Sequence, residues 1–216
     1  YIGRADRMER SITVNGFGKV SGDNDIAVTS IGYSNTNKDV AQAQADNNKV
    51  MDQVSAELKK IGIEDKDLQS NYSIYPEYNY TEEKGQELKG YRVTNNLTVK
   101  VRNLAKIGEV LGVAGKYGAN EVNGLNFTID DPENLKAKAR AKALADARMK
   151  AMTLANTMGV RLGEVIGYYE NETGELYPVA YDSRMMSGGA ATNPASVSSG
   201  SKDVSMNVSI IYEILQ

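Results

Sequence analysis

The chain has 216 residues, a formal net charge of −3 at pH 7, and neither cysteine nor histidine. The length suffices for one large domain or two small ones, and the near-neutral charge argues against a nucleic-acid partner. Without cysteine there is no disulfide, thiolate nucleophile or zinc–sulfur site. Without histidine the commonest general base and metal ligand is missing. An enzyme would therefore have to work with carboxylates, lysine or tyrosine, and no apolar run approaches the length that spans a bilayer.

Residues 1–10 are charged and lack periodicity, so we expect an N-terminal arm there. The first residue is Tyr1, which a removed secretory signal or simple trimming would explain. Apolar and polar residues then alternate on both sides of the turn-forming residues 21–25, which predicts a β-hairpin. Gly16 and Gly18 lie in its first strand. Their spacing does not fit a dinucleotide-binding loop, so we interpret them as positions where a neighbouring backbone approaches closely.

Apolar residues at helical spacing predict a helix over Val40–Ile61, capped from Asn35–Asn37 and ended by Gly62. A shorter helix capped by Asn103 is also expected, followed by a strand over Glu121–Ile129.

The strongest helical signal covers Pro132–Met158, between Asp130 and Asp131 as caps and Gly159 as the terminator. Its apolar residues step by three or four and are expected to share a buried face: Ala137, Ala141, Leu144, Ala147, Ala151, Leu154, Ala155 and Met158. Because this face is mostly alanine, we expect the helix to pack closely on a sheet.

Strands are expected over Val165–Glu170 and Val204–Leu215, with a flexible loop at residues 181–202 between them. The pattern predicts an α+β fold. An antiparallel or mixed sheet would carry two long helices and one short helix on one side, in two roughly similar strand–helix–strand–strand halves.

A tyrosine-rich hairpin is expected from strands over Leu68–Tyr80 and Tyr91–Arg102, with a polar tip at residues 81–90 and a protruding part at residues 72–91. Its tyrosines are Tyr72, Tyr75, Tyr78, Tyr80 and Tyr91. They would serve a subunit contact, since interfaces are rich in tyrosine. Stacking of sugars or bases is the alternative, although base stacking normally comes with a basic groove; cross-strand packing is the plain structural explanation. Together with Met185 and Met186 of the loop, these tyrosines are the predicted oligomer contacts.

The ordered features resemble the SIMPL-domain family of mostly exported bacterial and archaeal proteins. The resemblance rests on four segments and covers roughly Ser11–Leu215: ITVNGFGKV (Ile12–Val20), KKIGI (Lys59–Ile63), Gly90–Phe127 and Lys136–Val165. Gly22–Asp25 replaces the proline–aspartate turn of many relatives. The resemblance implies export to the periplasm or cell surface, an α+β domain over residues 11–216, and large homo-oligomers. Some members are linked to oxidative-stress protection, and the family supplies no catalytic residues.

We therefore expect a non-catalytic cell-envelope protein that assembles with itself, most simply in a closed ring. A binding module that holds an envelope glycan or a peptide through the tyrosine hairpin is the alternative, and a carboxylate-based enzyme is the third. Asp23 and Asp25 lack the spacing of a calcium loop. No catalytic, cofactor-binding or metal-binding residue, and no cofactor, is assigned.

Overall fold

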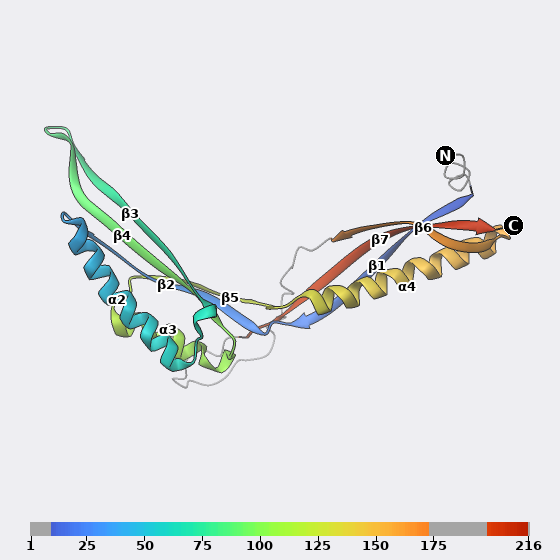
Figure 1. Ribbon diagram of the computed structural model, residues 1–216, viewed down its shortest axis with the longest axis horizontal. Coiled ribbons are helices and arrows are strands. Elements are labelled where there is room, and N and C mark those ends of the chain that lie inside the picture. The colour runs from blue at the N-terminus through green and yellow to red at the C-terminus, as the bar shows by residue number, and fades with distance from the viewer. Residues whose placement is uncertain (1–9, 173–197, 216) are drawn as a thin grey trace, which may run out of the picture. The chain divides into compact units, whose positions relative to one another are not determined.

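The computed structural model describes residues 10–172 and 198–215, and confirms the predicted α+β fold (Figure 1). In that part of the chain it contains three α-helices and two antiparallel sheets of three and four strands. The predicted arm, except Arg10, and most of the predicted loop with Met185 and Met186 lie outside the described residues. The described residues form two compact units: residues 10–23, 129–172 and 200–215 in unit 1, and residues 24–128 and 198–199 in unit 2.

Unit 1 is a three-stranded sheet with one long helix. Its elements are β1 (Ser11–Asp23), α4 (Glu133–Met158), β6 (Arg161–Glu172) and β7 (Ser201–Leu215), and the strand order is β1-β7-β6. Figure 1 shows α4 lying along β1 and β7. β7 begins at Ser201, inside the predicted loop, and Ile214 donates its backbone N–H to the carbonyl of Arg10 at 2.8 Å.

The predicted hairpin around residues 21–25 is wrong. β1 pairs with β7 over its whole length, with Gly16 opposite Val208. The next strand, β2 (Ile26–Asn37), belongs to the other sheet and pairs with β4 and β5. The turn-like residues connect two sheets, because β1 finds its partner at the far end of the sequence.

The buried face of α4 differs from the predicted one. Five alanines, each four residues from the next, are almost inaccessible to solvent and form the alanine row: Ala139, Ala143, Ala147, Ala151 and Ala155. Three of these were expected, whereas Ala137, Ala141, Leu154 and Met158 are exposed and Leu144 is half-buried. Spacing of four rather than 3.6 makes the row wind slowly around the helix, so α4 follows the twisted sheet.

Gly16 and Gly18 allow this helix to touch the strand, as expected from the sequence. A Cβ atom at Gly16 would lie 2.0 Å from the carbonyl oxygen of Ala143, and one at Gly18 would lie 2.0 Å from that of Ala139. Helix backbone therefore rests directly on strand backbone.

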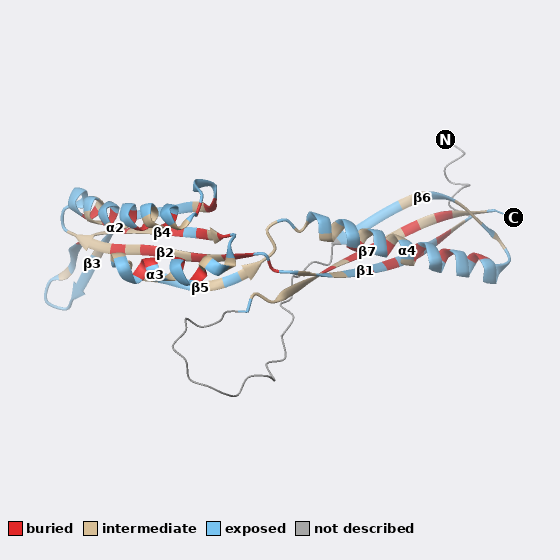
Figure 2. Ribbon diagram, turned by 90° about the horizontal axis from the view of Figure 1, so that it is seen from below, coloured by how far each residue is buried: buried red, intermediate tan, exposed pale blue. Residues whose placement is uncertain are grey.

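Unit 2 is a four-stranded sheet with two helices on one face. It contains β2, α2 (Val40–Ile61), β3 (Leu68–Thr81), β4 (Gly85–Val101), α3 (Ile107–Tyr117) and β5 (Glu121–Thr128), in the strand order β3-β4-β2-β5. Short 3-10 turns cover Asp65–Asp67 and Leu104–Lys106. The core between sheet and helices includes Ile31, Val54, Leu58, Val99 and Val110. Figure 2 shows buried stretches along β2 and β4, whereas the outer end of β3 is exposed.

The two ends of α2 are fixed by a side-chain cap at Asp39 and by a glycine at position 62. Asp39 is the N-cap and accepts from the backbone N–H of Ala41 at 2.8 Å, so the predicted cap at Asn35–Asn37 is wrong. Gly62 ends the helix in the left-handed conformation, as predicted. Asn103 accepts from the N–H of Ala105 and caps the turn before α3, as predicted.

Candidate functional site

The candidate site is the long hairpin of β3 and β4, whose outer part extends beyond the rest of its sheet. β4 is flanked by β2 only as far as Tyr91, which lies opposite Asn37. Residues 77–81 and 85–90 pair only with each other among the described residues. This two-stranded ribbon has too little neighbouring surface to bury its side chains. The turn is shorter than predicted, because residues 85–90, assigned to the polar tip, belong to β4.

One face of the hairpin is apolar and exposed. Successive side chains of a strand point to opposite faces, so Tyr72, Ile74, Tyr78 and Tyr80 share a face of β3. Ile74 lies opposite Val93, whose side chain is buried under α2, and the same face continues outward beyond the helix. Exposure rises toward the turn, from 38% at Ile74 to 52% at Tyr78 and 79% at Tyr80. Leu88, opposite Tyr78, adds a fifth side chain and is 44% exposed. We call these five residues the tyrosine face.

The opposite face of the hairpin carries an ion network at its base. Glu77 of β3 accepts from Thr36 of β2 at 3.0 Å and from Arg92 of β4 at 3.4 Å, and Lys89 lies 3.9 Å from its carboxylate. The other guanidinium nitrogen of Arg92 lies 4.0 Å from Glu121 of β5. These contacts join all four strands where the ribbon leaves the sheet, so its direction is held by unit 2.

β4 contains a bulge just beyond the ion network of Glu77. Glu77 pairs with Gly90 and Tyr78 with Leu88, so Lys89 is the extra residue. Gly90 has φ of +156°, and a Cβ atom there would lie 2.8 Å from the carbonyl oxygen of Asn37. A bulge increases the local twist of a hairpin, and here it turns the ribbon where β2 ends.

The predicted contact residues do not all lie on the same face of the hairpin. Tyr72, Tyr78 and Tyr80 lie on the tyrosine face, whereas Tyr75 lies on the opposite face and is 45% exposed. Tyr91 is half-buried beside β2. Met185 and Met186 lie outside the described residues. Ile74 and Leu88 were not predicted as contact residues. The alternation that groups Ile74 with three tyrosines is nevertheless visible in residues 72–80.

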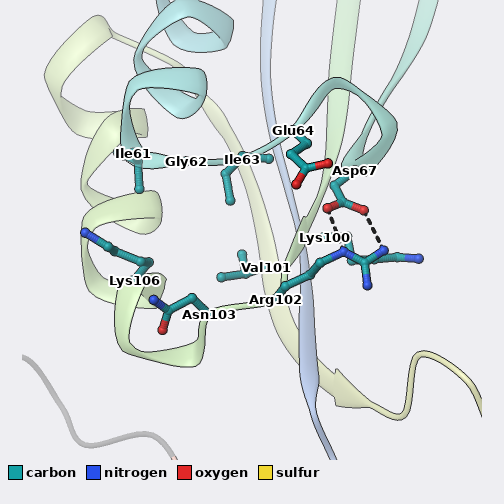
Figure 3. Close-up of a pocket in the computed structure, with 10 residues that line it drawn as sticks. All are labelled: Ile61, Gly62, Ile63, Glu64, Asp67, Lys100, Val101, Arg102, Asn103 and Lys106. Carbon is teal, nitrogen blue, oxygen red and sulfur yellow. Dashed lines mark hydrogen bonds and ion pairs between the residues drawn. The ribbon is translucent and has the colours of Figure 1, made fainter.

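A small pocket of about 230 Å³ lies at the other end of unit 2, where Figure 3 shows Asp67 facing Arg102. Asp67 is 6% exposed and accepts from the Nε and Nη2 of Arg102 at 2.8 and 2.9 Å. Ile61, Ile63 and Val101 form its apolar side. Glu64 pairs with Lys66 and Lys106 with Glu109, while Lys100 has a polar partner of its own. Each charged side chain that lines the pocket therefore takes part in an interaction.

Other site types have no support within the described residues. Residues 10–172 and 198–215 hold no group of three or more acidic side chains placed to bind a metal ion. None of the helices in the described part combines the length and apolar character of a membrane span.

Comparison with known proteins identifies relatives over most of the chain. Residues 12–212 match the family SIMPL, described as a protein of unknown function (DUF541). The 26 kDa periplasmic immunogenic protein of Brucella melitensis biotype 1 is 33% identical over 210 residues, which cover 94% of this chain and 84% of that protein. The uncharacterized protein YggE of Escherichia coli K12 is 33% identical over 155 residues, covering 71% of this chain and 63% of that protein. YggE of Edwardsiella ictaluri is 30% identical, covering 71% and 65%.

Proposed function

The chain belongs to the SIMPL family, and we propose that it is an exported, non-catalytic protein of the cell envelope that assembles with itself through the β3–β4 hairpin. The observation that carries the proposal is the tyrosine face, which leaves five large apolar side chains at least 38% exposed along one side of the β3–β4 hairpin. Contiguous apolar surface of this kind is typical of interaction sites.

The backbone of β3 supports a partner in strand form. β3 is an edge strand of its sheet, so its outer backbone groups have no neighbouring strand among the described residues. An edge strand is a template for pairing with another strand. A second copy of the hairpin offers both the complementary edge and a matching aromatic surface. Copies arranged in a closed ring would leave no such edge exposed.

Export is supported by the relatives, one of which is named as a periplasmic protein. A non-catalytic role is supported by the composition, since the 216 residues include no histidine or cysteine. It is also supported by the pocket beside Asp67, whose charges are paired. Turnover of a substrate, lost on a single carboxylate-to-amide change, would establish a carboxylate-based enzyme instead. The oxidative-stress role that the resemblance implies stays a prediction.

The second candidate function is a binding module that holds a glycan or peptide on the same hairpin. It is favoured by the exposed tyrosine rings, because each ring presents a flat apolar face and a polar hydroxyl to a ligand. Under this alternative, glycan-array or peptide pull-down signal is lost on Tyr78→Ala while the particle mass stays the same.

The absence of cysteine allows a direct test with a single attached fluorophore. Gln86 lies opposite Tyr80 and shares the tyrosine face, whereas Glu87 lies opposite Asn79 and points to the other side. We expect an environment-sensitive dye on Gln86→Cys to shift to the blue as the protein is concentrated from nanomolar to micromolar. The same dye on Glu87→Cys should respond less. A dye on Gln86→Cys that is indifferent to concentration would contradict assembly through this face.

A further inference from the structure

A groove runs between α4 and β6 in unit 1, beside the alanine row. Its volume is about 410 Å³, and it is lined by Arg148, Met152, Leu162, Gly163, Val165 and Tyr212. The helix packs mainly on β1 and β7 and meets β6 at few positions, so the third strand of the sheet is left largely uncovered. Met152 on the helix is 50% exposed and Val165 on the strand is 53% exposed. The walls of the groove are thus apolar and accessible.

Away from the groove, an ion pair joins the same helix and strand. Arg140 donates from Nε and Nη2 to Glu170 at 2.8 and 2.7 Å, and Tyr168 donates its hydroxyl to the same carboxylate. Arg148 stands two turns further along the helix, about 12 Å away at 1.5 Å per residue. One side of the groove is formed by α4, and its floor is formed by β6 and β7.

β6 is irregular where it forms this floor. Its pairing with β7 shifts register between Leu162 and Val165 and again between Val165 and Gly167. Such bulges re-aim side chains and are frequent beside binding sites. Here they fall on the residues that line the groove.

Of the described side chains that line the groove, only that of Arg148 is charged. Among residues 10–172 and 198–215, no hydrogen bond or ion pair engages its guanidinium. By contrast, Arg140 on the same helix donates from both Nε and Nη2 to Glu170. A guanidinium presents a planar pair of donors that matches a carboxylate. The groove therefore combines apolar walls with one guanidinium whose geometry suits a carboxylate.

We propose that this groove binds an apolar monocarboxylate, namely a fatty-acid anion with its chain against Met152, Leu162 and Val165 and its carboxylate on Arg148. The volume lies within the range of small-molecule sites, about 300–1,000 Å³. A single cation matches a monoanion, and apolar walls do not suit the hydroxyls of a sugar or the several charges of a nucleotide. The site is separate from the tyrosine face, and the proposal does not depend on assembly.

The test follows methionine methyl groups by nuclear magnetic resonance in the intact chain. The ligands are octanoate, 1-octanol with a similar chain but no charge, and propionate with the charge but a short chain. We expect the Met152 methyl signal to shift with octanoate until it saturates. The Met51 signal should stay in place, because Met51 is buried in the core of unit 2. Octanol and propionate should each bind several-fold more weakly.

Two variants on α4 separate the role of Arg148 from general charge. Arg148→Gln should weaken octanoate binding by about tenfold, the usual effect of losing a charge-assisted hydrogen bond, and leave octanol binding unchanged. Lys138→Gln removes a charge from the exposed side of the same helix and should change neither. Equal binding of octanoate and octanol, an equal loss in Lys138→Gln, or no saturable shift would overturn the proposal. So would a Met152 signal that responds to protein dilution instead of octanoate, because a second copy would then occupy the groove.

Discussion

The backbone N–H of Phe17 donates to the carboxylate of Asp146 at 2.9 Å, across 129 residues of sequence. The neighbouring carbonyl groups of β1 are engaged in the same way, since Lys142 donates to that of Lys19 and Lys150 to that of Asn15, both at 3.3 Å. These three α4 side chains stand four residues apart and cover the outer edge of β1. An edge covered by charged side chains is closed to further strands, whereas β3 in unit 2 has no such cover among the described residues.

Removing the carboxylate of Asp146, the middle one of these three side chains, should weaken unit 1. Asp146→Ala takes away the acceptor of the Phe17 N–H and the partner of Lys150 at 2.8 Å, so we expect a lower melting temperature. Asp52→Ala removes an exposed carboxylate of α2 and serves as the control. Equal melting temperatures for the two variants, measured by circular dichroism, would show that the edge contacts do not stabilise the fold.

The same carboxylate should contribute to the acid sensitivity of the protein. The Lys150 ammonium and then the Phe17 N–H lower the pKa of Asp146 below its usual value. Because the folded pKa lies below the unfolded one, the stabilisation is complete above about pH 4 and is lost as the pH falls through the folded pKa. The difference in melting temperature between wild type and Asp146→Ala should therefore shrink below about pH 4.

Glu170 should titrate well below an ordinary glutamate. Its hydrogen bonds from Arg140 and Tyr168 lower its pKa to about 2. Since the folded pKa is depressed, the stabilisation is present above about pH 4.3 and is lost as the pH falls toward the folded value. Carboxyl resonances followed against pH measure this directly. Arg140→Gln should return the pKa toward about 4.3, and Arg148→Gln should leave it unchanged; the reverse pattern would contradict the assigned pair.

Gly16→Ala should disrupt the contact between α4 and β1. The added Cβ would lie 2.0 Å from the carbonyl oxygen of Ala143 and 2.7 Å from the Cβ of Ala147, so the helix has to move away from the strand. We expect a loss of about 1–3 kcal/mol in the free energy of unfolding, as for overpacked cores. Gly112→Ala, in α3 with open space around it, should be neutral or stabilising. Urea denaturation measures the free energy of unfolding of both variants. An unchanged value for Gly16→Ala would mean that α4 does not pack closely on β1.

Local signals in the sequence predicted much of the fold. The periodicity of Val40–Ile61 and the glycine after it determined α2, and Gly16 and Gly18 indicated a close backbone contact. The hairpin at residues 21–25 was wrong, because turn residues between two alternating segments look the same whether or not the flanking strands pair. Each residue of β1 pairs with a residue 178 to 202 positions further along the chain, which no local sequence signal reveals.

The buried face of α4 was only partly predictable, because alanines occupy nearly every side of that helix. Apolar spacing therefore could not select Ala139 and Ala143 over Ala137 and Ala141. At the candidate site, the tyrosines of residues 72–80 predicted a strand with exposed contact residues. The division into two faces became clear only with the pairing to β4, which brings Leu88 beside Tyr78.

Asn47 should be needed for the packing of α2 on its sheet. Its side chain is fully buried, and its amide nitrogen donates to the carbonyls of Tyr33 at 2.8 Å and Val93 at 3.3 Å. Asn47→Ala leaves both carbonyls without this donor, so we expect a loss of about 1–3 kcal/mol in the free energy of unfolding. Asn48→Ala, one residue on and exposed, should change it by less than about 0.7 kcal/mol. Equal effects would show that burial of Asn47 has no energetic consequence.

The central claim, assembly through the tyrosine face, is tested most directly by sedimentation velocity at micromolar concentration. The wild-type chain should sediment as a particle well above the 23.5 kDa of one copy. The double variant Tyr78→Ser/Tyr80→Ser should sediment as a smaller species with an unchanged circular dichroism spectrum, since both side chains are exposed. Lys84→Ser, in the turn between β3 and β4, is the matched control and should keep the wild-type particle. A wild-type chain that sediments as a 23.5 kDa monomer would contradict the account.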